Sequence, residues 1–244
     1  MHLSEMRPPE WETCRKGRDL VKPEVWAPLY KRICEDFGFS PSEDLKSAKK
    51  LAVILGDRGI SALARTRGKV PSSVLVCGGS ESLQDELSSM TIDRYLVAAD
   101  SATSVVLEAG LRVDMIVTDL DGIVEDQISA NANGTTVFIH AHGDNQPALA
   151  RYAGRFLGPV VGTCQCPPPL GLFNFGGFTD GDRAACICAE LGAKEMLLAG
   201  FDFENPSEKP GKSQDVKKRK LRWARSILDE LSREGVKIVY AGER

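Results

Sequence analysis

The stretch that decides the fold is Met115-Ile116-Val117-Thr118-Asp119-Leu120-Asp121-Gly122, in which an apolar run passes directly into two aspartates and a glycine. An apolar run that ends in acids is typical of a buried parallel strand whose carboxyl end carries chemistry. Side chains alternate along a strand, so Asp119 and Asp121 share one face if the backbone stays extended. Two such carboxylates repel each other unless a cation lies between them, and Mg²⁺ also leaves room for substrate phosphates. A strand-end turn with solvated aspartates is the alternative.

The composition is that of an ordinary globular protein, with 244 residues, of which 42% are hydrophobic and 27% charged. This length predicts an α/β catalytic domain over residues 71–244 and a helical N-terminal region over residues 1–70. The net charge of −3 argues against nucleic acid as a partner. Neither a membrane-spanning run nor a signal peptide is visible, so we expect a cytoplasmic protein without a membrane partner. The sequence leaves the oligomeric state open, a homodimer included.

The seven cysteines indicate free thiols in a reducing compartment. Two CxC pairs, Cys164 with Cys166 and Cys186 with Cys188, raise the alternative of a structural zinc site. CxC is not the usual zinc clamp, and in a helix the side chains of residues i and i+2 point apart. Buried structural thiols are therefore the favoured interpretation.

The N-terminal region shows helical patterning. Apolar residues between Val25 and Phe37 recur at helical spacing, and Gly38 is expected to end that helix. The sequence Ser40-Pro41-Ser42-Glu43 predicts a capping box at the start of a second helix. This helix should run from Pro41 to about Arg67, with possible breaks at Gly56 and Gly59.

From residue 73 onward, short apolar runs alternate with helical segments. This order predicts an α/β fold with a mostly parallel, Rossmann-like three-layer sheet. The strands are expected at residues 74–77, 95–99, 115–118, 135–139, 159–163, 195–200 and 236–240. Helices are expected to begin near residue 81 or 82 and to cover about 102–108, 125–132, 147–156, 184–191 and 213–233.

Two strand ends predict contacts with a nucleotide. After the first strand come Gly78, Gly79 and Ser80, and a glycine turn before a helix lets backbone N–H groups face a phosphate. A tight turn without a ligand is the alternative. After the second strand come Asp100 and Ser101, where Asp100 is expected either to cap the next helix or to bind a ribose.

The strand at residues 135–139 is followed by His140-Ala141-His142-Gly143-Asp144-Asn145. Together the histidines and Asp144 would suit a transition metal. We favour Asp144 as a third Mg²⁺ ligand, with His140 and His142 contacting phosphate or substrate, because all three aspartates then converge on one hard cation. A polar turn is the alternative.

The segment Phe173-Asn174-Phe175-Gly176-Gly177-Phe178-Thr179-Asp180-Gly181-Asp182-Arg183 combines aromatic rings with amide, acidic and basic groups. Such a set suits a flat heterocycle, although a packing loop with a helix cap at Asp180 or Asp182 is the alternative. The helix expected at residues 213–233 is basic, which usually marks a solvated face, while the lysines of this region would also neutralise a polyphosphate.

Four motifs in this order resemble the archaeal-type 6-hydroxymethyl-7,8-dihydropterin pyrophosphokinase family. They are Ala99-Asp100-Ser101-Ala102, Thr118-Asp119-Leu120-Asp121-Gly122, His140-Ala141-His142-Gly143-Asp144-Asn145 and Gly176-Gly177-Phe178-Thr179-Asp180-Gly181-Asp182-Arg183-Ala184. That family is distantly similar to the catalytic domain of thiamin pyrophosphokinases, so the resemblance implies a thiamin-pyrophosphokinase-like fold over about residues 73–240.

The resemblance implies transfer of pyrophosphate from ATP to the hydroxymethyl group of a dihydropterin, with release of AMP, in pterin or folate-type cofactor biosynthesis. Asp119, Asp121 and Asp144 would hold Mg²⁺. ATP would contact Gly78, Gly79, Ser80, Asp100, Ser101, Lys212 and Lys220, and the substrate would contact His140, His142, Asn174, Asp180, Asp182 and Arg183. An assisting base would be an aspartate or a histidine of residues 140–144.

Other functions fit the acidic motif. Asp119 resembles the nucleophile of haloacid-dehalogenase-type phosphatases, although Ile123 departs from their pattern and the motif lies mid-chain. A sugar-nucleotide transferase with Mn²⁺, a pyrophosphokinase with thiamin as acceptor, and a nucleotide- or pterin-binding module without catalysis are further alternatives. An enzyme is favoured because a binding module has little need of three converging carboxylates.

Overall fold

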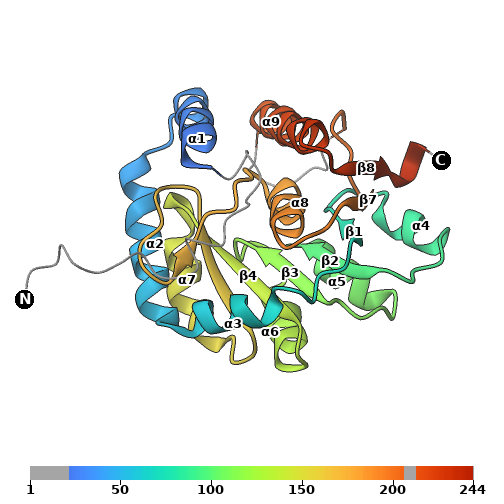
Figure 1. Ribbon diagram of the computed structural model, residues 1–244, viewed down its shortest axis with the longest axis horizontal. Helices are drawn as coiled ribbons and strands as arrows, with labels where there is room; N and C mark the ends of the chain where they lie inside the picture. Colours follow the sequence, from blue (N-terminus) through green and yellow to red (C-terminus); the bar gives the residue numbers. More distant parts are fainter. Residues whose placement is uncertain (1–21, 206–212, 244) are drawn as a thin grey trace, which may run out of the picture.

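The computed structural model describes residues 22–205 and 213–243, and an eight-stranded sheet forms its centre. Every neighbouring pair of strands is parallel, in the order β6-β5-β4-β3-β2-β1-β7-β8 (Figure 1). The predicted parallel α/β fold is therefore confirmed. The strands are β1 (Ser73–Cys77), β2 (Tyr95–Ala99), β3 (Met115–Thr118), β4 (Thr136–Ala141), β5 (Val160–Cys164), β6 (Leu172–Phe173), β7 (Glu195–Ala199) and β8 (Lys237–Tyr240).

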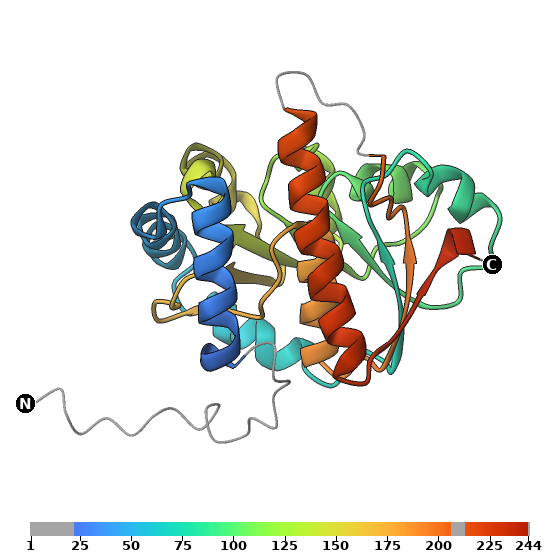
Figure 2. The same cartoon turned by 90° about the horizontal axis from the view of Figure 1, so that it is seen from above.

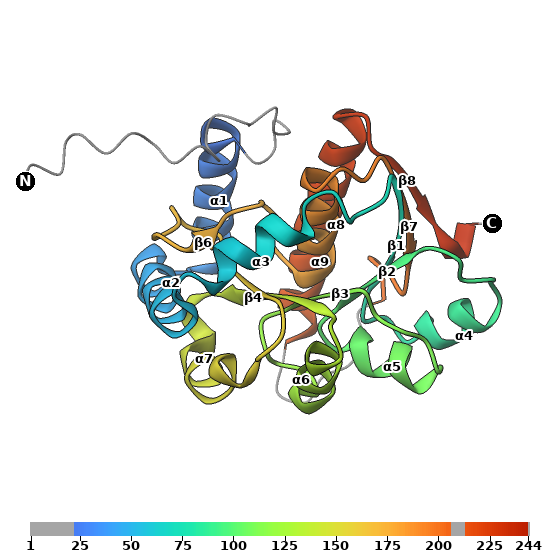
Figure 3. The ribbon, with the colours of Figure 1, turned by 60° about the horizontal axis from the view of Figure 1, so that its bottom comes forward.

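Helices cover both faces of the sheet and make three layers (Figure 3). On one face lie α4 (Leu83–Ser88), α5 (Ala102–Glu108), α6 (Val124–Ala132) and α7 (Gln146–Tyr152), which connect consecutive strands from β1 to β5. The connections after β6 and β7, through α8 (Asp180–Glu190) and α9 (Gln214–Arg233), run in the opposite direction along the sheet. Because parallel crossovers are right-handed, α8 and α9 lie on the other face.

The N-terminal helices α1 (Pro23–Phe37), α2 (Pro41–Leu55) and α3 (Arg58–Thr66) share one hydrophobic core with the sheet. Figure 2 shows α1 beside α9, where the Trp223 indole N–H donates to Asp36 over 2.9 Å. The division of the chain at residue 70 stays a prediction. Gly38 (φ 68°) ends α1 as expected, and the second helix breaks at Gly56 (φ 54°).

The predicted capping box at the start of α2 is wrong. Ser40 is the N-cap residue, but its hydroxyl makes no capping bond and lies 2.8 Å from the hydroxyl of Ser42. The Glu43 carboxylate is engaged by Lys46 at 2.6 Å and does not reach back to the Ser40 backbone. A local ion pair one turn along the helix replaces the reciprocal cap.

The chain reverses direction along the sheet between β1 and β7. The next strand after β1 in the chain, β2, lies on one side of this pair, and the next strand after β7, β8, lies on the other side. The loops that leave β1 and β7 therefore diverge and leave a crevice at the carboxyl ends of these two strands. Two glycines let these loops touch: a Cβ on Gly78 would lie 2.6 Å from the Gly200 carbonyl oxygen, and Gly200 has a φ of 70°. In open α/β sheets, ligands bind in a crevice of this kind.

The cysteines of the described residues are buried free thiols, as predicted: Cys34, Cys77, Cys164, Cys166, Cys186 and Cys188. Within residues 22–205 and 213–243, no helix has both the length and the apolar character that crossing a membrane requires.

Candidate active site

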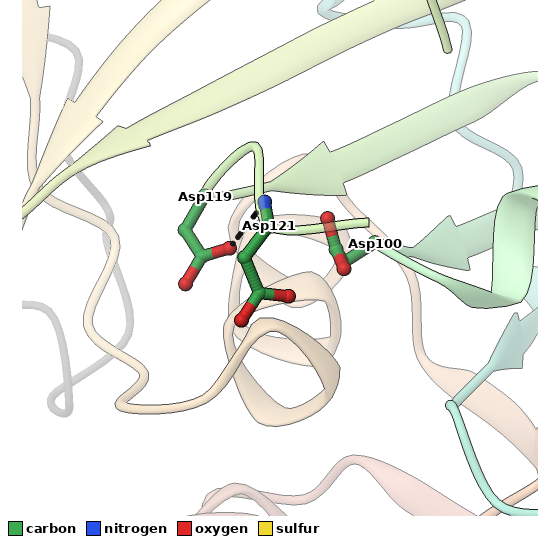
Figure 4. A group of neighbouring side chains, drawn as sticks. All are labelled: Asp100, Asp119 and Asp121. Atoms are coloured by element: carbon green, nitrogen blue, oxygen red, sulfur yellow. Dashed lines mark hydrogen bonds between the residues drawn. The ribbon is translucent and has the colours of Figure 1, made fainter. Parts of the chain in front are cut away.

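Three carboxylates meet at the carboxyl edge of the sheet. Asp100 follows β2, while Asp119 and Asp121 follow β3, and one oxygen from each lies within 4.8 Å of the others (Figure 4). We call this group the acid cluster. Its third member was expected to be Asp144, and the register of the strands explains why it is Asp100.

Both β2 and β4 are neighbours of β3, so strand order alone does not choose between Asp100 and Asp144. On the β2 side, Ala99 is level with Val117, which places Asp100 at the end of the strand beside Thr118. On the β4 side, Ile139 is level with Thr118, so Asp144 comes five residues beyond the residue of β4 that is level with Thr118. Asp144 lines the same cavity with an exposed side chain, and its role as a metal ligand stays a prediction.

The backbone that carries the acid cluster is not extended. Leu120 has a φ of 69° and Asp100 a φ of 44°, a left-handed conformation that is costly for residues other than glycine. The expectation that Asp119 and Asp121 share a strand face is therefore wrong. They converge instead because the turn at Leu120 brings the Asp121 N–H within 3.2 Å of Asp119 Oδ1.

Asp100 is held by donors that all reach the same oxygen. Its Oδ1 accepts from the Thr118 hydroxyl at 2.7 Å, the Gln127 amide at 3.1 Å and the Gly122 N–H at 3.3 Å. Its Oδ2 faces the turn that carries Asp121, 2.7 Å from where a Cβ on Gly122 would lie. Asp100 does not cap α5, which has no side-chain cap, and its predicted contact with a ribose stays a prediction.

The acid cluster carries more negative charge than its surroundings balance. Burial, followed by the nearby charge of Asp119, raises the pKa of Asp100 to about 6. Burial and Asp119 also raise the pKa of Asp180 well above its usual range, although its 3.0 Å ion pair with Arg183 opposes the shift. Crowded carboxylate oxygens of this kind are the donors that Mg²⁺ prefers, so the residues present fit a hard divalent cation.

The two predicted histidines take different positions. The Nε2 of His142 lies 3.2 Å from Asp119 Oδ2, and its Nδ1 accepts the Asp144 N–H at 3.3 Å. His140 is buried, with its Nδ1 3.1 Å from the hydroxyl of Thr163. Burial is the largest cause that lowers the pKa of His140 well below its usual value, and the charges of Arg183 and His142 add to it.

The residues predicted from the segment 173–183 divide into two groups. Asp180 and Arg183 line the cavity. Asn174 and Asp182 do not line it and serve the loop itself. The Asn174 amide donates to the Gln165 carbonyl at 3.1 Å, and Asp182 accepts the Phe178 N–H at 2.6 Å in a capping box with Thr179.

A cavity of about 620 Å³ joins these groups. At the crevice between β1 and β7 it is lined by Gly78, Gly79, Ser80, Ser101 and Phe201, and the acid cluster lines it as well. From α9, Lys220 reaches it with its Nζ 5.7 Å from the Phe39 ring and 5.8 Å from the Phe178 ring. Lys212 lies outside the described residues.

Asp44 and Gln165 are among the lining residues that sequence reasoning missed. Asp44 is buried on α2, where it stands on the same face as Ala48, Leu51 and Leu55. An acid within an apolar helical stripe was therefore the available signal. Gln165 lies directly after β5 between two cysteines, and the CxC pattern drew attention to the thiols on either side.

The chain is similar to proteins of one family over most of its length. The family model described as "6-hydroxymethylpterin diphosphokinase MptE-like" matches residues 46–208. A Methanothermobacter thermautotrophicus protein called 6-hydroxymethyl-7,8-dihydropterin pyrophosphokinase is 41% identical over 225 residues, which covers 87% of this chain and 96% of that protein. Proteins of the same name from Pyrococcus furiosus and Methanocaldococcus jannaschii are 38% and 32% identical, over 88% and 84% of this chain and 96% and 94% of their own lengths.

Proposed function

The chain belongs to the MptE-like 6-hydroxymethylpterin diphosphokinase family, and on that premise we propose that it transfers pyrophosphate from ATP to the hydroxymethyl group of 6-hydroxymethyl-7,8-dihydropterin. It is an enzyme of the pyrophosphokinase class. The observation that carries the proposal is the acid cluster, which lies in one cavity with the glycine turns of the crevice. Three crowded carboxylates in a cavity that also contains a glycine turn are typical of metal-assisted phosphoryl transfer.

In the proposed reaction the hydroxymethyl oxygen attacks the β-phosphorus of ATP. The bond between that phosphorus and the oxygen bridging to the α-phosphorus breaks, and AMP leaves with the bridging oxygen. The hydroxyl proton passes to solvent as the new bond forms. Phosphoryl transfers of this type depend mostly on positioning and on stabilising charge, so a strong base is not required.

Asp100, Asp119 and Asp121 would hold Mg²⁺, with Asp144 as a further predicted ligand. When bound, this ion neutralises phosphate charge and orients the polyphosphate. His142 is already engaged on both ring nitrogens, by Asp119 and by the Asp144 N–H, so it acts as a positioning residue for Asp119. Arg183 and Lys220 line the same cavity and supply positive charge to it.

The nucleotide is assigned to the crevice between β1 and β7. There the N–H groups of Gly78 and Ser80 already donate to the Ala199 and Gly200 carbonyls at 2.7 and 3.0 Å, so the Gly79 N–H is the one that the turn would offer to a phosphate. Phe201 and Phe203, whose rings lie 6.1 Å apart, line the same end of the cavity and offer apolar surface to an adenine.

The proposal is tested by incubating the protein with ATP, Mg²⁺ and a panel of acceptors that contains 6-hydroxymethyl-7,8-dihydropterin and thiamin, and by assaying AMP, ADP and free phosphate. AMP that forms only with the pterin is the expected result. AMP formation with thiamin alone would transfer the assignment to that acceptor, and ADP or free phosphate would refute pyrophosphate transfer. Omission of Mg²⁺ should abolish AMP formation.

A further inference from the structure

The half of the cavity away from the crevice is built around Gln165. Its side-chain N–H donates over 2.7 Å to Asp44 Oδ2, which also accepts the Tyr30 hydroxyl at 2.6 Å. Its backbone carbonyl accepts the Trp26 indole N–H at 2.8 Å. Because a carboxylate oxygen only accepts here, the amide nitrogen must face Asp44 and the amide oxygen must face the other way.

Gln165 therefore presents an acceptor to the cavity that it lines. Within the described ranges, residues 22–205 and 213–243, no side chain or backbone N–H donates to its amide oxygen. The residue is 5% exposed, and its backbone is fixed by Trp26 and Asn174. An amide oxygen held in one orientation at a cavity wall without a donor is a preorganised contact for a ligand.

A second acceptor comes from His140. The Thr163 hydroxyl donates to the Ile139 carbonyl at 3.2 Å, so its oxygen is left to accept from His140 Nδ1 at 3.1 Å. This chain of bonds places the proton of the neutral ring on Nδ1 and leaves a lone pair on Nε2. That Nε2 is buried and has no hydrogen-bond partner among the described residues, and His140 lines the cavity.

Aromatic rings line the same region. Phe39 and Phe178 border the cavity with their centroids 6.3 Å apart, and Phe37 stacks behind Phe39 at 5.3 Å. A flat ligand would find apolar surface here together with two hydrogen-bond acceptors.

We propose that the Gln165 amide oxygen and His140 Nε2 recognise adjacent N–H donors on the edge of the pterin ring, with Asp44 as the positioning residue that orients Gln165. This inference rests on the proposed function. The 2-amino-4-oxo edge of a pterin carries two neighbouring donors, the 2-amino group and N3–H. The corresponding edge of adenine pairs a donor with an acceptor, so the two ligands are distinguished by hydrogen bonding.

The test measures the affinity of 6-hydroxymethylpterin by quenching of its fluorescence, without ATP, for the wild type and for Gln165→Leu. We expect the variant to weaken pterin binding at least about tenfold while the Kd of an unhydrolysable ATP analogue stays within about twofold. Gln84→Leu changes an exposed glutamine on α4 in the same way and should leave both affinities unchanged. Equal loss of both ligands, or no loss of pterin, would overturn the inference.

A second measurement uses the wild type alone and does not depend on how well a variant folds. The matching lumazine, which has an oxo group in place of the 2-amino group, should bind at least about tenfold more weakly than the pterin. In Gln165→Leu this preference should shrink to about twofold. Equal wild-type affinity for both compounds would overturn the inference, whereas a wild type that binds pterin but forms no AMP would refute the proposed function alone.

Discussion

Asp44 and Asp100 are two buried aspartates that line one cavity, 3% and 5% exposed, and their hydrogen bonds are distributed differently. Asp44 accepts on both oxygens, from the Gly143 N–H at 2.7 Å on Oδ1 and from Tyr30 and Gln165 on Oδ2. Asp100 accepts all three of its donors on Oδ1, while Oδ2 faces the acid cluster.

The difference separates a structural carboxylate from a ligand-binding one. Donors on both oxygens compensate the burial of Asp44 within the protein and connect α1, α2 and the loops after β4 and β5. Asp100 has one compensated oxygen and two carboxylate neighbours, so its burial is unfavourable until a cation arrives. Removing each charge should therefore have opposite effects on stability.

The largest effect is expected when the acid cluster loses a ligand without losing its shape. Asp121→Asn keeps the size of an exposed side chain but removes one charge, so AMP formation should fall by about 10³-fold or more while the melting temperature stays within a few degrees. The matched control is Asp93→Asn, an exposed aspartate outside the cavity, which should retain full activity. Activity of Asp121→Asn above about a tenth of wild type would remove the acid cluster from the mechanism.

Asp44→Ala should give the largest loss of stability. The Tyr30 hydroxyl, the Gly143 N–H and the Gln165 amide would all lose their acceptor in a buried site. At about 1–3 kcal/mol for each buried donor left unsatisfied, with partial relaxation, we expect the free energy of unfolding to fall by about 4 kcal/mol in urea titrations. The exposed Asp57→Ala on the neighbouring turn is the control and should change it by less than about 0.5 kcal/mol. A loss from Asp44→Ala no larger than that of the control would contradict the structural role.

Asp100→Asn should have the opposite sign in the absence of divalent metal. Because the pKa of Asp100 is raised from 3.8 to about 6, the native state binds this proton more tightly than the unfolded state does. The protonated Asp100 therefore contributes to the free energy of unfolding below about pH 4, and this contribution is lost as the pH rises through about 6. At pH 8 in EDTA the neutral asparagine, which keeps the acceptor for Thr118, Gln127 and Gly122, should raise the free energy of unfolding by about 2 kcal/mol.

The comparison of Asp44 with Asp100 also predicts how Mg²⁺ changes the melting temperature. Mg²⁺ should raise the melting temperature of the wild type at pH 8 and have little effect at pH 5, where protonation already relieves the acid cluster. Asp100→Asn should lose most of the shift at pH 8, and Asp93→Asn should keep it. Destabilisation by Asp100→Asn in EDTA at pH 8, or a Mg²⁺ shift equal at both pH values, would show that the charges are balanced by the protein.

The acid cluster was largely visible in the sequence, because each strand and the acids after it lie within a few residues of one another. The apolar run from Met115 predicted both the buried β3 and the carboxylates at its end. The choice of Asp100 over Asp144 was not visible, because it depends on strand register and on the left-handed turn at Leu120. Neither feature follows from a local pattern of residue types.

The other half of the cavity was largely hidden. Asp44 and Gln165 are 121 residues apart in the chain, and their hydrogen bond exists only because α2 packs beside the strand that precedes Gln165. Asn174 and Asp182 were predicted to bind a ligand from their residue types and from the family resemblance. In the structure Asn174 bonds to Gln165 and Gly176, and Asp182 caps α8, which is the alternative that the sequence left open. Sequence patterns identify sites formed by one strand and its turn more readily than sites assembled from distant helices.

The smallest expected effect concerns Lys220, which tests whether α9 contributes charge to the acidic side of the cavity. Its ammonium lies over the Phe39 and Phe178 rings and makes no ion pair with the residues that the structure describes, so it is available to attract a polyphosphate. Lys220→Met should raise the KM for ATP about three- to tenfold with little change in kcat, and the effect should diminish at high ionic strength. Lys218→Met removes the same charge from an exposed position on α9 and controls for the net charge of the helix. Equal changes in KM for the two variants would mean that α9 acts through its overall charge, and the position of Lys220 above the rings would then have no part in binding ATP.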